Sequence, residues 1–354
     1  MNKINNERIY LDLHALQTVP PSNLNRDDTG SPKTAKFGGV VRSRVSSQSW
    51  KKAMRTYFVN SGIDENVGIR SLNIVEYLAK EITNIDTSKS MEDAMAQARD
   101  TFKNLGISTK DNKLQALLFV SKKQIHELAK ASCDGVTDKK QLKEILNTKQ
   151  AIDIALFGRM VANDASINED ASAQVAHAIS THEVQTEFDF FTATDDLKAE
   201  VESGAGMLGT VEFNSSTLYR YANLNIHELK RQLEENAKQI MDTIKIYVEA
   251  FIKSMPTGKV NTFANQTLPE AILVVCRNDR PVNLVNAFEN PVKAKNGYME
   301  ESIQRLQSEY DKTKKFVDEP IFTLTINMNE LGTNVNNIQN LLTKLEDEIN
   351  KILF

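Results

Sequence analysis

The amino-acid sequence predicts an α+β fold with a helical segment inserted into it. Two observations support this prediction. Outside residues 63–150, strand-like and helix-like segments follow one another in the order strand, helix, strand, strand, helix, strand. Within residues 63–150 the pattern is helical, polar and rich in Lys and Glu. The length allows two domain-sized units, although one fold with a large insertion fits it equally well.

The first strand is predicted over Arg8–Leu16, where apolar and polar residues alternate. A loop of about twenty residues follows, crowded with Pro, Asn, Asp, Ser and Gly, and a compact domain seldom carries such a loop without a functional reason. Val40–Val45 predicts a short strand. The hydroxyls of Ser46 and Ser47 then predict the cap of a helix that begins near Gln48.

Four segments between residues 64 and 149 carry the helical pattern of the insertion: "VEYLAKEI", "MEDAMAQARDTFKNL", "LQALLFVSKKQIHELAKA" and "KKQLKEIL". The residues after it, 175–193, have the Thr, Val and Phe content of a strand. Acidic residues and glycines then separate two strand-like flanks, which predicts a long projecting hairpin at about residues 190–215.

A strand follows at residues 217–226, with Asn225 as the cap of one long helix that ends before Pro256. The apolar run "AILVVCR" predicts a buried strand, and a further strand, "IFTLTINM", and helix, "NNIQNLLTKLEDEINKIL", complete the chain. With the insertion set aside, the order of elements is that of the split βαβ, ferredoxin-like unit.

Composition limits the class of protein. No apolar run is long enough to span a bilayer and the start of the chain is polar, so we expect a soluble cytoplasmic protein. Cys133 and Cys276 are too few for a disulfide framework or a zinc cluster. A net charge of −4 argues against general affinity for polyanions, so any nucleic-acid binding must come from a clustered surface.

One segment of the chain contains such a cluster of positive charge. Residues Arg26–Arg55, here called the cation strip, hold eight Lys or Arg and two Asp in an otherwise acidic chain. The cations lie near a helix N-terminus, follow a long loop and alternate with hydroxyl and amide side chains, which suits sequence-independent contacts to phosphate. The alternative is a solvated helix face, which is what most charge runs are.

Candidates for catalysis are few. We expect structural roles for His14, His126, His177, His182 and His227. His177 and His182 are five residues apart on a predicted strand, so they would point to opposite faces and share no metal.

Asp27 and Asp28 on the loop could hold Mg²⁺ against a phosphate. Alternatively they bind their own backbone in a turn and orient Arg26, and we favour this interpretation. Two aromatic pairs, Phe190–Phe191 and Tyr219–Tyr221, are possible base platforms, but we expect alternation to bury one member of each.

Taken in order, a set of motifs resembles the CasC family, the repeated backbone subunits of type I-E CRISPR Cascade complexes. The motifs run from the first strand to about Tyr298: "SNLNRDD", "FGG", "RVSSQSWKKAMR", "DIALFGRM", "VAHAISTHEV", "FFTATDDL", "MLGTVEF", "LYRYANLNI" and "NAFENPVKAKNGY". The resemblance implies a ferredoxin-like, RRM-like palm of residues 1–62 and 151–354, with the hairpin as a thumb and residues 63–150 as a helical finger.

The resemblance also implies a role for particular residues. The family's contacts to the RNA backbone match Arg26, Lys33, Arg42, Arg44, Ser46, Gln48, Lys51 and Arg55. Met160 matches a wedge that packs against the RNA beside a kink. The thumb residues that flank the displaced nucleotide match Phe190, Phe191, Thr192 and Leu208, with Phe190 in place of a tryptophan. Lys259 and Asn261 look like a further contact to RNA or to a neighbouring copy.

The function that the resemblance implies is non-catalytic and needs no cofactor: binding of guide crRNA, kinking by the thumb, and presentation of short segments for pairing with target DNA. The implied partners are further copies in a helical filament, the large and small subunits, the cap subunit at the 5′ end and the crRNA-processing endonuclease. We also expect the acidic thumb residues Asp195, Asp196, Glu200 and Glu202 to dock on a neighbour's positive surface. The alternative is a metal-dependent ribonuclease that uses Asp27 and Asp28, as in type III relatives.

Overall fold

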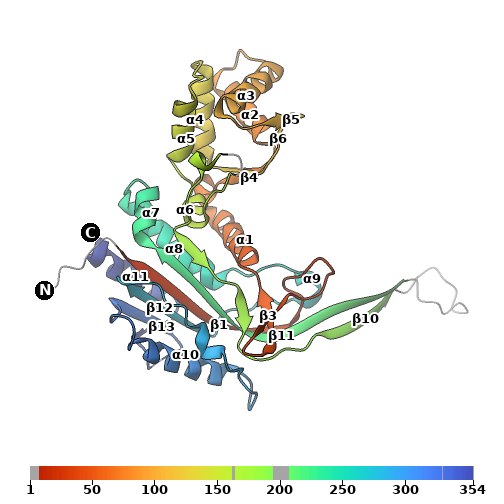
Figure 1. Ribbon diagram of the computed structural model, residues 1–354, viewed down its shortest axis with the longest axis vertical. Helices are drawn as coiled ribbons and strands as arrows, with labels where there is room; N and C mark the ends of the chain where they lie inside the picture. Colours follow the sequence, from red (N-terminus) through yellow and green to blue (C-terminus); the bar gives the residue numbers. More distant parts are fainter. Residues whose placement is uncertain (1–7, 162–163, 194–206, 329, 354) are drawn as a thin grey trace, which may run out of the picture. The chain divides into compact units, whose positions relative to one another are not determined.

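The computed structural model describes residues 8–161, 164–193, 207–328 and 330–353 (Figure 1). These residues form two compact units. The sheet unit comprises Met1–Met54, Val175–Asn223 and Val248–Phe354, and the helical unit comprises Arg55–Gln174 and Leu224–Tyr247. The four boundaries between the units fall within α1 (Ser47–Phe58), β8 (Ala173–Val175), β11 (Met207–Asn225) and α8 (Ala237–Lys253).

The main sheet has the strand order β14-β13-β12-β1-β11-β9-β3-β2. Its strands are β1 (Tyr10–Ser22), β2 (Thr34–Phe37), β3 (Val40–Val45), β9 (Ala178–Ser180), β11 (Met207–Asn225), β12 (Ala271–Arg277), β13 (Phe322–Ile326) and β14 (Thr333–Asn334). The stretch β12-β1-β11-β9 places the fourth, first, third and second strands of the expected order side by side. This is the ferredoxin-like arrangement, so the predicted α+β class is confirmed.

Each face of the sheet has its own core. Tyr219 and Tyr221 of β11 pack with β12 residues and with Leu306 of α10 (Met299–Thr313). Leu218 of the same strand packs on the other face with Trp50 of α1. Neighbouring residues of a strand point to opposite faces, so β11 serves both cores. The C-terminal helix α11 (Ile338–Leu353) contacts β13.

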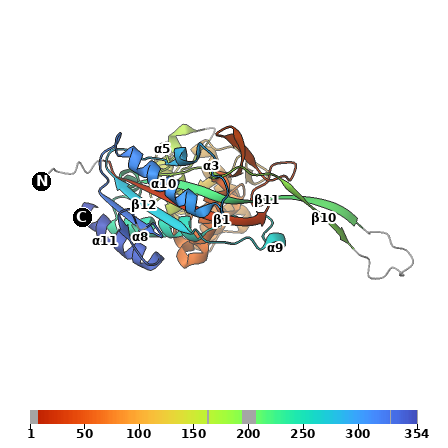
Figure 2. The same ribbon diagram turned by 90° about the horizontal axis from the view of Figure 1, so that it is seen from below.

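The predicted hairpin is present. Strand β10 (Glu187–Ala193) pairs antiparallel with the first part of β11, from Glu187 opposite Phe213 to Ala193 opposite Met207. These paired strands extend away from the rest of the sheet unit (Figures 1 and 2). The acidic residues expected at its tip, Asp195, Asp196, Glu200 and Glu202, lie outside the described residues.

The prediction of a long loop after residue 16 was wrong in two places. Strand β1 continues through Pro20 and Pro21 to Ser22. Its pairing with β12 stops at Leu16, so one edge of β1 is released from that neighbour, and a proline without an N–H is tolerated there. Further on, β2 and β3 form a hairpin with Gly38 and Gly39 at its turn, both at positive φ, as tight hairpin turns require.

The prediction of one strand over residues 175–193 was also wrong. The segment contains β8 (Ala173–Val175), β9 and β10. Ser180 lies opposite Leu218, whereas Glu187 lies opposite Phe213, so seven residues on one strand span the distance of five on the other. The extra residues bulge out of the ladder, which separates β9 from β10.

A third difference is a break in the long helix predicted after Asn225. Asn225 caps α7 (Ile226–Gln232) as expected, with its Oδ1 accepting from the N–H of Glu228 at 3.1 Å. Glu234 and Glu235 then adopt positive φ, and Asn236 caps α8 by accepting from the N–H of Gln239 at 3.0 Å. The asparagine before "AKQ" is therefore a second helix start.

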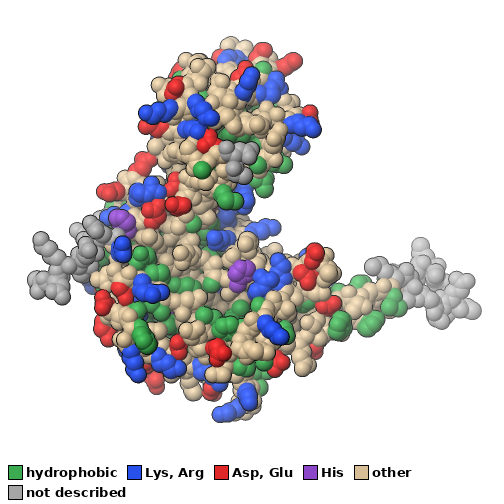
Figure 3. All heavy atoms as spheres, viewed as in Figure 1, with side chains coloured by type: hydrophobic (Ala, Val, Ile, Leu, Met, Phe, Trp, Pro, Cys, Tyr) green, Lys and Arg blue, Asp and Glu red, His purple; other side chains and the backbone are tan. Residues whose placement is uncertain are grey.

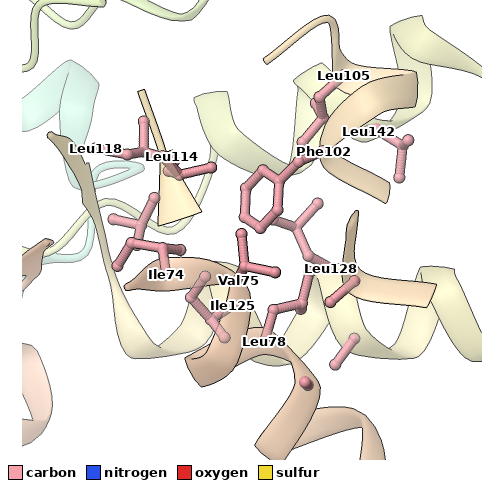
Figure 4. Close-up of a cluster of buried hydrophobic side chains, with 14 of the residues drawn as sticks. Ile74, Val75, Leu78, Phe102, Leu105, Leu114, Leu118, Ile125, Leu128 and Leu142 are labelled. Carbon is pink, nitrogen blue, oxygen red and sulfur yellow. The ribbon is translucent and has the colours of Figure 1, made fainter. Parts of the chain in front are cut away.

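The helical unit confirms the predicted insertion of helices. Its core is formed by α2 (Ile74–Ile85), α3 (Met91–Leu105), α4 (Lys122–Cys133) and α5 (Lys139–Asn147), with Phe102 among the buried side chains (Figure 4). Leu118–Val120, predicted as helix, forms strand β7 and pairs with β4 (Ile69–Ser71). Helix α4 starts only at Lys122 because Ser121 and Gln124 form a capping box there.

The remaining elements are short. They are the two-residue strands β5 (Thr109–Lys110) and β6 (Lys113–Leu114), helix α6 (Ile152–Phe157), helix α9 (Val260–Phe263), the π-turn Val59–Ile63 and the 3₁₀ turns Asp64–Asn66, Ala165–Ile167 and Val285–Phe288. Among the helices of the described ranges, none combines the length and the apolar character that crossing a bilayer requires.

Candidate nucleic-acid interface

The loop that carries Arg26 and Lys33 is attached to the start of α1 by Asn25. Its Oδ1 accepts from the N–H of Ser46 at 2.8 Å, and its carbonyl accepts from the N–H of Lys33 at 2.8 Å. Asn25 therefore fixes the loop cations relative to the helix N-terminus, through its side chain and its main-chain carbonyl. Asn25 was not among the predicted site residues, although it lies inside the motif "SNLNRDD".

The N-terminus of α1 has the predicted cap. Ser46 is buried, and its Oγ accepts from the N–H of Ser49 at 3.3 Å. Gln48 is exposed and Lys51 is half-buried, and this burial lowers the pKa of Lys51. The helix N-terminus thus presents a partial positive charge beside an amide and an ammonium group, the combination that binds phosphate.

Arg44 lies on strand β3, which precedes α1, at the edge of this surface. Its Nε donates to the carbonyl of Thr34 at 3.1 Å, and its Nη1 lies 3.1 Å from Nδ1 of His177. Lys33 and Arg44 are joined through their backbones, since the N–H of Arg44 donates to the carbonyl of Lys33 at 2.9 Å. On the face of the sheet unit that Figure 3 shows, a histidine lies beside a group of Lys and Arg side chains.

Two further arginines of the cation strip have internal partners. Arg42 is fully buried, and its guanidinium donates to the carbonyls of Phe37, Ser180 and Phe288 at 3.1, 3.0 and 2.8 Å. Arg55, in the helical unit, forms an ion pair with the buried Asp153 at 2.7 Å. Both were predicted to contact RNA, and both have partners in the free protein that such a contact would have to replace.

Asp27 uses its carboxylate in its own turn. Its Oδ1 accepts from the N–H and hydroxyl of Thr29 at 2.9 and 2.7 Å and from the N–H of Ser31 at 3.0 Å. These hydrogen bonds, led by the hydroxyl of Thr29, lower the pKa of Asp27. Within the described residues, no three His, Cys, Asp or Glu side chains are grouped as metal ligands.

The hairpin exposes its apolar side chains. Phe188, Phe190 and Leu208 are exposed, with Phe190 at 70%. Phe191 is also exposed and lies across Gly209, where an added Cβ would come within 2.3 Å of its ring. The expectation that one member of the Phe190–Phe191 pair would be buried was therefore wrong, because β10 projects and every one of its side chains is exposed.

The same expectation failed in the opposite direction for Tyr219 and Tyr221, which are both buried. Two residues apart on a strand, they share a face that a core covers. Two of the other histidines have the structural roles expected of them: burial lowers the pKa of His14 to about 3, and His182 accepts from the N–H of Thr217 at 3.1 Å. His177 and His182 do not share a strand, because His177 lies between β8 and β9 and His182 lies after β9.

The segment around α9 lies against the start of the loop. An added Cβ at Gly258 would come within 2.1 Å of the carbonyl oxygen of Leu24, so this position tolerates only glycine. Lys259 next to it has a φ of 46°, in the left-handed region, and Asn261 is exposed. In the helical unit, the side chain of Met160 is 84% exposed.

Two comparisons relate this chain to known proteins. A model of the CT1975-like protein family matches residues 11–351. A chain from the solved structure "CRISPR RNA-guided surveillance complex, pre-nicking" is 30% identical with a TM-score of 0.85, over 96% of this chain and 99% of that chain.

A chain from a second solved structure, "CRISPR RNA-guided surveillance complex", is 24% identical with a TM-score of 0.75 and covers the same shares, which supports the fold alone. No curated protein matches the sequence. The family match spans nearly the whole described chain and confirms the resemblance seen in the motifs. The chain therefore belongs to the CT1975-like family of CRISPR-associated (Cas) proteins.

Proposed function

We propose that this chain is a non-catalytic backbone subunit of a type I-E CRISPR surveillance complex in the cytoplasm. It binds guide crRNA through the sugar-phosphate backbone, and copies of it stack along the guide. The observation that carries the proposal is the surface of the sheet unit on which Asn25 fixes the loop cations beside the helix N-terminus of α1. Such a surface recognises phosphate and no base edge, so it accepts any guide sequence.

The proposed interface comprises the loop, strand and helix positions Arg26, Lys33, Arg44, Ser46, Gln48 and Lys51. We leave out Arg42 because its side chain is fully buried, and Arg55 because it is paired with the buried carboxylate of Asp153. Lys259 and Asn261 extend the interface, supported by the contact of Gly258 with Leu24. Met160 is proposed as the wedge of the helical unit, supported by its exposure.

The paired strands β10 and β11 are the proposed thumb, with Phe190, Phe191, Thr192 and Leu208 beside the displaced nucleotide. Residues 63–150 are the proposed finger and the remainder the palm. The other proposed partners are the large, small and cap subunits, the crRNA-processing endonuclease, and target DNA through pairing with the guide.

Removing two cations tests the proposal. We expect Arg44→Ala combined with Lys51→Ala to weaken guide binding roughly tenfold to a hundredfold and to lower the slope of log K against log salt by about 1.4, since each phosphate contact on a single strand contributes about 0.7. The loss should be similar for guides of unrelated sequence, measured by fluorescence anisotropy at several salt concentrations.

The matched control removes two exposed cations from helices α10 and α11 of the same unit, Lys312→Ala with Lys351→Ala. It should leave the affinity and the salt slope unchanged. A loss in the Arg44 and Lys51 variant that depends on guide sequence would mean that these residues read bases, and an equal loss in both variants would remove the interface from this surface.

A second experiment tests the absence of catalysis. Incubated with complementary RNA and Mg²⁺, the assembled complex should leave the RNA intact, because the Oδ1 of Asp27 is occupied by its own turn. Regularly spaced cleavage that disappears in Asp27→Ala or Asp28→Ala would replace the proposal with the ribonuclease alternative. The product pattern on a denaturing gel decides between them.

A further inference from the structure

His177 faces the cations of the proposed interface. In the ladder between β3 and β9, Arg44 lies opposite Ile179 and Val45 lies opposite Ala178, and His177 directly precedes Ala178. The side chains meet, with 3.1 Å between Nη1 of Arg44 and Nδ1 of His177. His177 is exposed to solvent, so a ligand can reach it.

In the free protein, this contact determines which ring nitrogen of His177 carries the hydrogen. An arginine nitrogen only donates, so Nδ1 of His177 is the acceptor and the ring hydrogen is on Nε2. Burial, together with the charges of Arg44 on β3 and Lys33 on the preceding loop, lowers the pKa of His177. The imidazole is therefore neutral near neutral pH, with one N–H available to a ligand.

A phosphate beside Arg44 changes this balance. Its negative charge offsets the two cations and favours a protonated ring, in which both nitrogens donate. The guanidinium can then turn from the ring to the phosphate, because Nδ1 no longer accepts. The proton comes from solvent and returns to solvent when the phosphate leaves.

We propose that His177 is a proton-coupled contact of the guide, and that its ring takes up a proton when a guide phosphate binds beside Arg44. The inference rests on the proposed guide binding. Since the bound state holds more protons than the free state, affinity for the guide increases as the pH falls. A change of one unit in the pKa of His177 corresponds to about a tenfold change in affinity.

The test measures binding of a fluorescent single-stranded RNA to the purified protein at fixed salt, from about pH 8 to about pH 5.5. The dissociation constant of the wild type should fall about threefold to tenfold over this range. His177→Gln keeps an acceptor for Arg44 but does not titrate, so it should lose this dependence. His227→Gln removes an exposed histidine of α7 in the helical unit and should retain it.

Calorimetry of the wild type in two buffers of different ionisation enthalpy gives the proton uptake directly, independent of whether the variant folds. Uptake near pH 6.5 that exceeds that of His177→Gln supports the inference. A wild type without uptake, or a His177→Gln variant with the same pH dependence, overturns it while guide binding stands. Failure to bind RNA at any pH overturns the proposed function and the inference with it.

Discussion

Replacing Arg42 by Met lowers the free energy of unfolding by about 3–5 kcal/mol, because the carbonyls of Phe37, Ser180 and Phe288 lose their donor and each buried acceptor left alone costs about 1–3 kcal/mol. Arg42→Lys keeps the charge, but its ammonium donates from a single point and cannot reach all three carbonyls, so we expect about half of this loss. Urea denaturation of the three proteins measures the difference.

Arg44→Met is the matched control, because both arginines lie on the same face of β3. Arg44 is only partly buried, and its loss should cost less than about 1 kcal/mol. In RNA binding we expect the opposite order of effects. Arg44→Met lowers the salt slope, whereas the slope of folded Arg42→Lys is unchanged. An unaltered stability of Arg42→Met with a lowered salt slope would contradict the internal role and restore Arg42 as an RNA contact.

Replacing Arg55 by Ala lowers the free energy of unfolding by about 3–5 kcal/mol, since it leaves the fully buried carboxylate of Asp153 without its ion-pair partner. The arginine also donates to the carbonyl of Gly68 at 3.1 Å, while the N–H of Gly68 donates to Asp153 at 2.7 Å. The pair and this glycine thus close one hydrogen-bonded unit. Thermal and urea unfolding measure the loss.

The loss should depend on pH. Burial raises the pKa of Asp153, and Arg55 opposes this rise. Without Arg55 the folded protein holds the proton to higher pH than the unfolded chain, so the variant becomes less stable as pH rises, and its deficit is larger at about pH 8 than at about pH 5.

Adding Asp153→Asn to Arg55→Ala removes the buried charge and should recover part of the stability. Lys80→Ala, which breaks an exposed ion pair with Glu76 in the same unit, should cost about 0.5 kcal/mol or less. If the double variant were no more stable than Arg55→Ala, the buried charge would not be the cause of the loss.

The order of the elements could be predicted from the sequence because periodicity reports local burial. The run "AILVVCR" became β12 with every residue buried, and Ser46 and Asn225 cap the helices expected after them. The errors lie where contacts between residues distant in sequence determine the secondary structure. Strand β1 continues through Pro20, beyond the end of its pairing with β12. The break between β9 and β10 follows from a register difference along β11, which no local pattern encodes.

The burial of individual residues in the cation strip was harder to predict than the strip itself. Charge density located the cation strip, but charge does not tell which arginine is covered. Arg42 and Arg44 share a face of β3, yet the carbonyls of Phe288 and Glu289, distant in sequence, lie over the first and not the second. The contact of His177 with Arg44 was missed for the same reason, since only the pairing of β3 with β9 brings the two residues together.

The exposed strand β10 has a consequence for the synthesis of the protein in the cell. A seven-residue strand with three phenylalanines, all exposed, is a template for aggregation when nothing covers it. Glu187 before the phenylalanines and Asp189 between Phe188 and Phe190 place charge where identical strands would stack, which slows that process without preventing it. If the cell makes more of this chain than of the partners that cover β10, the excess protein is therefore prone to aggregate. Production of the chain in balance with its partners keeps β10 covered.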